Sequence, residues 1–236
     1  MTYSKSKVDR AGQTLADCLR MIDDGKATVI ERSPELVHAV EIIDWWRGEH
    51  ARPLSRVAAN LRYYAGEHEA PRVAQRLKKF PTIADKLLRQ PTMKLSRMAD
   101  IGGVRAVLPD QDAAYSVARR LRKNWTITRF RDYVADPKAD GYRALHLINR
   151  NHGRLIEVQL RTRLQDAWAN SVEVDARRTA PGLKFGTGPR ELHDFYIALG
   201  EFLAIADQGL PADQALYEQV MELREQVDIF RGGATK

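Results

Sequence analysis

The chain has 236 residues, of which 44% are hydrophobic and 29% charged, so it can bury a core in one large or two small domains. It contains no apolar run as long as a membrane-spanning helix, and its polar N-terminus lacks the apolar stretch of a signal peptide. Cys18 is the only cysteine, which excludes an internal disulfide and a cysteine-rich zinc site and favours a cytoplasmic location.

The charge balance is basic, with 38 Lys and Arg against 31 Asp and Glu, a formal net charge of +7. Residues 71–99 contain eight basic residues and one acid, and residues 119–131 contain six basic residues and no acid. Such clusters predict contact with a polyanion such as nucleotide phosphates or nucleic acid, although a helix can also carry a basic face into solvent.

The first third of the chain is predicted to be helical. Ser33-Pro34-Glu35 is typical of a helix start, with Ser as the N-cap and Pro at the first helical position. Apolar residues then recur with a helical period from residue 36 to residue 46. We expect Pro53 to separate this helix from the next, at 54–64, and a further helix at 81–89.

The pattern changes near residue 100. Short apolar or alternating runs predict strands, and longer amphipathic runs predict helices. We expect strands at 101–108, 125–130, 142–149 and 155–160, helices at 112–123 and 163–177, a loop at 179–190, and closing helices at 191–206 and 212–230. This order predicts an α/β fold: a mixed β-sheet flanked by helices (71–178), with helical segments before it (1–70) and after it (179–236).

Two acids occupy unusual positions. Asp100 immediately precedes the first predicted strand, and Glu157 lies inside a strand with Gln159 on the same face. A carboxylate there is costly unless it lies at an edge, is paired, or binds a metal. Two carboxylates beside a phosphate-rich substrate suit Mg²⁺, and salt bridges to the many arginines are the alternative.

Several motifs follow one another in a characteristic order. Their sequence and spacing resemble the synthetase domain of the RelA/SpoT family, especially its stand-alone small alarmone synthetases, over about residues 72–175. The resemblance implies the nucleotidyltransferase-like mixed sheet of that family and an ATP-dependent pyrophosphokinase, a transferase. The motifs are Arg76 to Arg89 (RLKKFPTIADKLLR), Asp100 to Arg105 (DIGGVR), Arg131-Asp132-Tyr133, Lys138, Gly141 to His146 (GYRALH), Glu157 to Thr162 (EVQLRT), and Trp168.

The resemblance also implies a donor site for ATP. Asp100 and Glu157 match the magnesium-binding acids, and Glu157 matches the presumed base for the acceptor hydroxyl. Planar guanidinium groups stack well on rings, which agrees with a pair of arginines around the adenine. The implied ATP-binding residues are Arg76 and Arg105 at the adenine, and Lys78, Thr82, Lys86 and Arg89 at the phosphates, with Thr82 replacing the usual Ser.

An acceptor site is implied in the same way. Tyr142 matches the aromatic residue that stacks on the acceptor base. The other matching positions surround the acceptor nucleotide or its phosphates: Lys138, Arg143, His146, Gln159 and Arg161. Before the resemblance is considered, packing and binding are equally open for His146, whereas ordinary packing at the edge of the core is favoured for Tyr142.

Two acceptors are open. One is GDP or GTP, which gives ppGpp or pppGpp in the stringent response. The other is the 3′-CCA end of tRNA, the substrate of the family's translation-blocking toxins, each of which is restrained by an antitoxin. The basic charge favours tRNA, as does the segment Trp46 to Leu54, which looks like a segment of toxic members.

Departures from the alarmone pattern also favour tRNA. Asp166 and Val172-Glu173 stand where alarmone synthetases tend to carry Asn and Glu-His, although an Asp can still pair with guanine. A third interpretation is an inactive RNA-binding module, against which the retention of both acids argues. The apolar stripes of the closing helices serve internal packing, an oligomer partner or an antitoxin.

Overall fold

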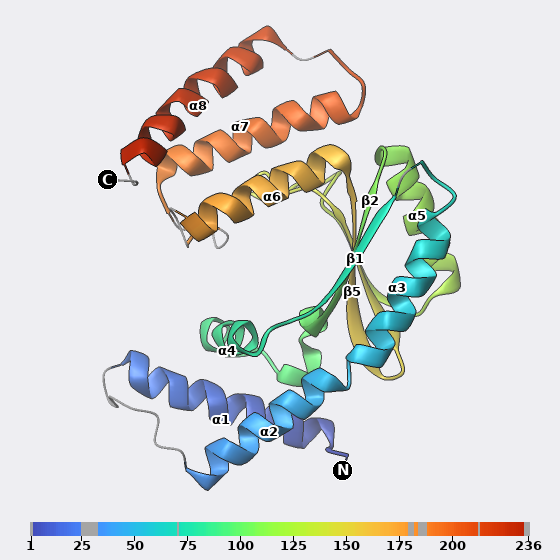
Figure 1. Cartoon of the computed structure of the whole chain (residues 1–236), viewed down its shortest axis with the longest axis vertical. Helices are drawn as coiled ribbons and strands as arrows, with labels where there is room; N and C mark the ends of the chain where they lie inside the picture. Colours follow the sequence, from blue (N-terminus) through green and yellow to red (C-terminus); the bar gives the residue numbers. More distant parts are fainter. Residues whose placement is uncertain are drawn as a thin grey trace.

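The computed structural model describes residues 2–24, 33–69, 71–178, 182–183, 188–211 and 213–233. Its centre is a five-stranded sheet in the order β1-β2-β5-β4-β3, so the prediction of a mixed sheet flanked by helices is confirmed (Figure 1). The β2–β5 pair is parallel and the other pairs are antiparallel. The strands are β1 (Arg72–Leu77), β2 (Gly102–Leu108), β3 (Ile127–Asp132), β4 (Leu145–Asn151) and β5 (Arg154–Thr162).

One face of the sheet is covered by α3 (Ala51–Ala65) and α5 (Gln111–Asn124). Alternate residues of the strands point to this face, because successive side chains in a strand lie on opposite sides. The buried cluster that results contains Val104, Ala106 and Leu108 from β2, Leu145 and Leu147 from β4, and Ile156, Val158 and Leu160 from β5.

A second apolar cluster forms where α1 (Lys5–Asp23) and α2 (Pro34–Gly48) pack with α4 (Phe80–Arg89) and the 3₁₀ turns η1 (Leu95–Arg97) and η2 (Ala99–Ile101). The predicted start of α2 is confirmed, since the Ser33 side chain accepts a hydrogen bond from the Leu36 N–H at 3.2 Å. This cluster supports α4 and the turn that carries Asp100.

The third cluster joins α6 (Arg163–Arg178), α7 (Arg190–Asp207) and α8 (Gln214–Gly233). These helices lie beyond one end of the sheet, opposite α1, α2 and α4 (Figure 1). The backbone of α7 touches the loop before β4, because a Cβ built on Gly200 would lie 2.8 Å from the Gly141 carbonyl oxygen. Gly141 itself has a φ of +86°, which glycine adopts readily.

The structure differs from the sequence-based expectations at several boundaries. Strand β1 was not predicted, because it is an edge strand with mostly exposed polar residues and no apolar alternation. Pro53 does not separate two helices but lies in the first turn of α3, where its missing N–H breaks no helical bond. Strand β4 begins at Leu145 rather than residue 142, and β3 runs two residues later than predicted at both ends.

Within the described ranges, no helix is both long and apolar enough to cross a membrane. Of the predicted loop at 179–190, residues 179–181 and 184–187 lie outside the described residues.

Candidate active site

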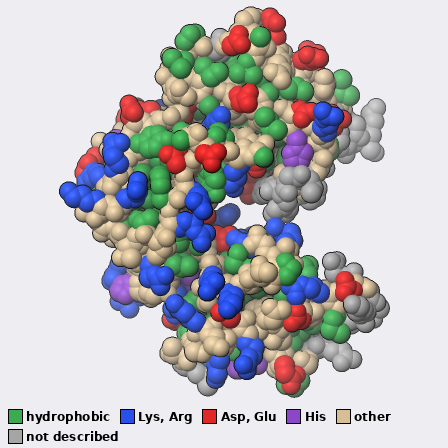
Figure 2. All heavy atoms as spheres, turned by 180° about the vertical axis from the view of Figure 1, so that it is seen from behind, with side chains coloured by type: hydrophobic (Ala, Val, Ile, Leu, Met, Phe, Trp, Pro, Cys, Tyr) green, Lys and Arg blue, Asp and Glu red, His purple; other side chains and the backbone are tan. Residues whose placement is uncertain are grey.

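The sheet face opposite α3 and α5 forms the floor of a cleft of about 550 Å³. Figure 2 shows a hollow between the two halves of the molecule, with Lys and Arg side chains gathered around it. The lining residues come from β1, η2, β2, β4, β5, the loop before β4, and α6. Those predicted from the sequence are Arg76, Asp100, Arg105, Lys138, Tyr142, His146, Glu157, Gln159 and Arg161.

Strand register brings these side chains together. Arg105 lies opposite Gln159, and Gln159 lies opposite His146, so one row of polar residues crosses three strands. Gly103 lies opposite Glu157, and even an added Cβ at Gly103 would have only the Arg76 side chain nearby, at 3.9 Å. The missing side chain at Gly103 therefore leaves open space in front of Glu157.

Asp100 is held between two lysines. Lys78 Nζ lies 2.9 Å from Oδ2 and Lys86 Nζ lies 2.8 Å from Oδ1. Burial alone would raise the pKa of Asp100, but the charges and hydrogen bonds of the two lysines outweigh it, so the pKa lies below its usual value. Asp100 is therefore ionised at neutral pH, and both predicted phosphate-binding lysines contact this cleft-lining carboxylate.

Glu157 is held by His146 and Gln159 rather than by lysines. Its Oε1 lies 3.3 Å from His146 Nδ1, and its Oε2 accepts a hydrogen bond from Gln159 Nε2 at 2.9 Å. Burial pushes the pKa of Glu157 up, and Asp100 adds to that, but the interactions with His146 and Gln159 prevail and the pKa is lowered. The carboxylate is thus ionised at neutral pH and has no lysine or arginine bonded to it among the described residues.

These two carboxylates fit a magnesium ion. Both line the same cleft, and the charge of Asp100 acts on the pKa of Glu157. The residues described contain no group of three or more His, Cys, Asp or Glu side chains that could form a complete metal cage. Mg²⁺ is commonly bound by one or two protein carboxylates together with substrate phosphates, so Asp100 and Glu157 are the candidate ligands, and a bound ion would displace some of their present partners.

Tyr142 occupies the other end of the polar row. Its hydroxyl lies 2.7 Å from His146 Nε2 and accepts a hydrogen bond from Arg161 Nη2 at 3.1 Å. Lys138 Nζ lies 4.6 Å from the centre of the Tyr142 ring. Burial raises the pKa of Tyr142 despite the opposing charge of Arg161, so the phenol keeps its proton.

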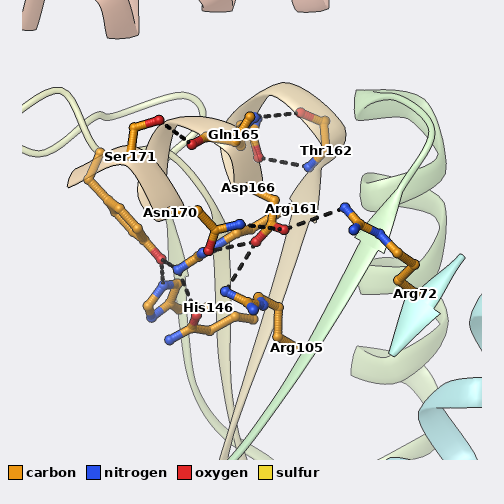
Figure 3. Close-up of polar contacts among 12 residues, drawn as sticks. Arg72, Arg105, His146, Arg161, Thr162, Gln165, Asp166, Asn170 and Ser171 are labelled. Carbon is orange, nitrogen blue, oxygen red and sulfur yellow. Dashed lines mark hydrogen bonds and ion pairs between the residues drawn. The ribbon is translucent and has the colours of Figure 1, made fainter. Parts of the chain in front are cut away.

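Asp166 is the most connected acid near the cleft, and the sequence did not predict this role. It is 3% exposed, and it contacts Arg72, Arg105, Arg161 and Asn170 (Figure 3). Because it does not line the cleft and its oxygens are engaged, it is not free to pair with a guanine. The departure from the alarmone synthetase pattern had drawn attention to Asp166, but only the fold reveals the arginines around it.

Five predicted site residues are not among those that line the cleft. Two of them, Lys78 and Lys86, are paired with Asp100, which does line it. Thr82 and Arg89 are exposed on α4, and Arg89 is paired with Asp85 at 2.7 Å. Arg143 points instead to a small cavity between α6 and α7, where burial lowers its pKa against the raising effect of Glu201. The predicted roles of Thr82 and Arg89 with phosphates remain predictions, and Arg143 is not brought to the acceptor residues.

A row of exposed arginines extends the same sheet face toward the β3 edge. Arg131 lies opposite His146, Arg129 lies opposite Ile148, and Arg150 follows on β4. Within the ranges that the structure describes, none of the three forms an ion pair, whereas exposed arginines such as Arg89 do. Two of them belong to the basic cluster at 119–131, but the sequence did not place them beside the cleft.

Comparisons with known proteins agree with this architecture. Residues 75–177 match the family model described as "Region found in RelA / SpoT proteins". The chain is 32% identical over 120 residues to the GTP pyrophosphokinase YwaC of Bacillus subtilis, covering 44% of this chain and 57% of YwaC. The chain thus spans little more than half the length of YwaC.

Two solved structures share the fold. Small alarmone synthetase 2 of Bacillus subtilis has a TM-score of 0.55 at 25% identity, covering 66% of this chain and 90% of its own. Small alarmone synthetase 1 of Bacillus subtilis, bound to its product pppGpp, has a TM-score of 0.59 at 22% identity, covering 78% of this chain and 99% of its own. The sheet and its flanking helices are therefore those of a synthetase-type fold.

Proposed function

This chain belongs to the RelA/SpoT family through residues 75–177, and from that premise we propose that it is an ATP-dependent pyrophosphokinase. The observation that carries the proposal is the pair of ionised carboxylates, Asp100 and Glu157, in one cleft with Arg76 and Arg105. A cleft of this volume can take a nucleotide, and cations around it suit a triphosphate.

The proposed reaction transfers the β- and γ-phosphates of ATP to an acceptor. The acceptor's 3′-oxygen attacks the β-phosphorus, the bond between the β-phosphorus and the oxygen of AMP breaks, and AMP leaves. Glu157 receives the proton of the 3′-hydroxyl, because it is ionised and faces the open space at Gly103. Asp100 and Glu157 would hold Mg²⁺, which offsets charge on the phosphates.

Other residues position the two substrates. Lys78 and Lys86 bring positive charge to the donor side beside Asp100, where the leaving and transferred phosphates lie. Arg76 and Arg105 take the adenine, and Tyr142 with Lys138 takes the acceptor nucleoside. His146 orients Glu157 by its 3.3 Å contact, and its other ring nitrogen is occupied by Tyr142.

For the acceptor, we favour the 3′-CCA end of tRNA, which would make the protein a translation-inhibiting toxin. Two structural features support this choice. Asp166, at the position where guanine recognition is expected, is buried among arginines. Arg129, Arg131 and Arg150, which form no ion pair within the described part of the chain, continue the cleft face in a direction where a long phosphate backbone, but not a small nucleotide, would use them.

GDP or GTP is the second candidate acceptor. The observation in its favour is the sequence similarity to YwaC, which is a GTP pyrophosphokinase. With that acceptor, the product would be ppGpp or pppGpp, and the same donor site and the same Glu157 would serve.

Label transfer from ATP tests the function and separates the acceptors. The protein is incubated with ATP labelled on the γ-phosphate and offered deacylated tRNA, tRNA trimmed of its CCA end, GDP or GTP. We expect label in intact tRNA only, and its loss in Glu157→Gln. Label only in guanine nucleotides would replace the tRNA proposal by the second candidate. No label in any acceptor would contradict the pyrophosphokinase itself.

A toxin has a further consequence in cells. Expression of the active protein should stop translation and growth, and Glu157→Gln should relieve both effects at equal protein level. Growth arrest by both forms alike would contradict a toxicity that depends on transfer. An antitoxin, if one exists, is expected to restore growth with the active form.

A further inference from the structure

We propose that Asp166 is a positioning residue that holds Arg105 and Arg161 in one arrangement and so couples substrate binding on the two sides of the cleft. The inference rests on the proposed function, because that function assigns Arg105 to the ATP side and Arg161 to the acceptor side. It concerns a residue that touches neither substrate, since Asp166 does not line the cleft.

The Asp166 carboxylate is shared between the two arginines. Its Oδ1 lies 3.1 Å from Arg105 Nη1 and 3.2 Å from Arg161 Nη1, and Figure 3 shows both guanidinium groups converging on it. Its Oδ2 lies 3.2 Å from Asn170 Nδ2 and 3.6 Å from Arg72 Nη2. Both oxygens are therefore occupied, and a single oxygen joins the arginines of two neighbouring strands.

The two arginines differ in what else holds them. The Arg161 side chain is 8% exposed, and its Nη2 donates to Gln159 Oε1 at 2.9 Å and to the Tyr142 hydroxyl at 3.1 Å. The Arg105 side chain is 34% exposed, and among the described residues Asp166 is its only ion-pair partner. Arg105 thus depends on Asp166 for its position more than Arg161 does.

Charge makes this arrangement cooperative. Without the carboxylate, the two guanidinium groups would face each other as like charges in a partly buried place, where repulsion is strong. A ligand that draws Arg105 toward itself changes the contact between Arg105 and Asp166 Oδ1. The contact of Arg161 with the same oxygen then changes too, and Arg161 donates a hydrogen bond to Tyr142. A ligand on one side must therefore change affinity on the other, and the effect must be reciprocal.

Asp166→Asn tests the proposal, with Asp175→Asn as the matched control. Asp175 also lies on α6 and is 4% exposed, but it does not line the cleft and accepts a hydrogen bond from the Tyr196 hydroxyl at 2.7 Å. Both variants remove one buried carboxylate charge from the same helix. A merely structural role of Asp166 predicts that the two variants behave alike.

Two readouts distinguish them. In Asp166→Asn, the KM values for ATP and for the acceptor should both rise about fivefold or more, with a smaller change in kcat, and Asp166→Glu should restore part of the loss. The Kd of a non-hydrolysable ATP analogue should also no longer depend on the presence of acceptor. In Asp175→Asn, the melting temperature should fall while both KM values and the dependence stay as in the wild type.

Matching KM values in the two Asn variants would overturn the proposal, as would an unchanged effect of acceptor on analogue binding in Asp166→Asn. If Asp166→Asn does not fold, Arg105→Gln serves instead. Loss of this donor-side arginine should raise the KM for the acceptor, and an unchanged acceptor KM overturns the proposal.

If the wild type transfers to no acceptor, the proposed function fails. The analogue's Kd alone then compares Asp166→Asn with Asp175→Asn, and equal values overturn the proposal.

Discussion

The two faces of the sheet are built from the same strands, but one forms the hydrophobic core and the other lines the cleft. On the helix-covered face, Val158 and Leu160 are fully buried against α3 and α5. On the cleft face, their neighbours Glu157 and Gln159 point into open space among cations. Because strand side chains alternate, neighbouring residues of β5 contribute either to the buried core or to the cleft. Substitutions on one face should therefore affect one property far more than the other.

The cleft face is stable because its charges are paired within it. Asp100 has two lysines, Glu157 has His146 and Gln159, and Asp166 has its arginines. Unpaired charges at these depths would be costly. Substrate phosphates and a cation would therefore exchange partners with groups that are already ionised and in place.

The largest effect should come from Glu157→Gln. The amide keeps the shape of the side chain but accepts no proton, so we expect transfer to fall about 10²-fold or more. Single-turnover transfer of label from ATP measures it. The control is Glu173→Gln, which removes an acid that also lines the cleft but lies on α6. Equal losses in both variants would mean that Glu157 has no special role.

Leu160→Ala, three residues further along β5, should lower stability but leave transfer activity nearly unchanged. It removes a fully buried side chain from the helix-covered face and should lower the free energy of unfolding by about 2–5 kcal/mol. Urea unfolding measures the change. Transfer activity well below the melting temperature should stay near the wild-type value, and a large loss there would break the division between the faces.

A buried histidine gives the helix-covered side a pH dependence. His50 is 1% exposed, with its Nδ1 2.8 Å from the Trp46 carbonyl oxygen, and burial, aided by the charge of Arg154, lowers its pKa from 6.5 to about 4. Between these values the unfolded chain binds more protons, so stability falls as the pH drops from about 6.5 toward 4.

Replacement of His50 isolates this contribution. The loss assigned to His50 is about 2–3 kcal/mol between pH 7.5 and 4.5, and it should be absent in His50→Gln. Urea unfolding of both proteins at the two pH values measures the difference. An identical pH dependence in the two proteins would contradict the lowered pKa.

The smallest effect should come from the exposed end of the cleft face. Arg129→Ser combined with Arg131→Ser should weaken binding of a CCA-ended RNA about tenfold and reduce its salt dependence by about one to two phosphate contacts. The KM for ATP should not change. The control, Arg52→Ser with Arg62→Ser on α3, removes the same charge from the opposite side of the sheet. An equal loss of RNA binding in the control would mean that only net charge matters.

Much of the fold followed from residue patterns. The alternation in β2 and β5 and the capped start of α2 were evident, because each depends on local periodicity or on a single turn. Strand β1 was missed because an edge strand is half solvated and shows no apolar alternation. Arg143 was expected at the acceptor site with Tyr142, but both residues lie in the loop before β4, and Arg143 lines the small cavity between α6 and α7 instead.

The order of the motifs by itself determined the family and named the two carboxylates, because spacing along a chain preserves which residues a shared fold brings together. Only the tertiary structure decided their partners: two lysines at Asp100, a histidine at Glu157, and arginines from three strands at Asp166. The physical reason is that pairing and burial depend on register and helix docking between distant segments, which no local pattern encodes.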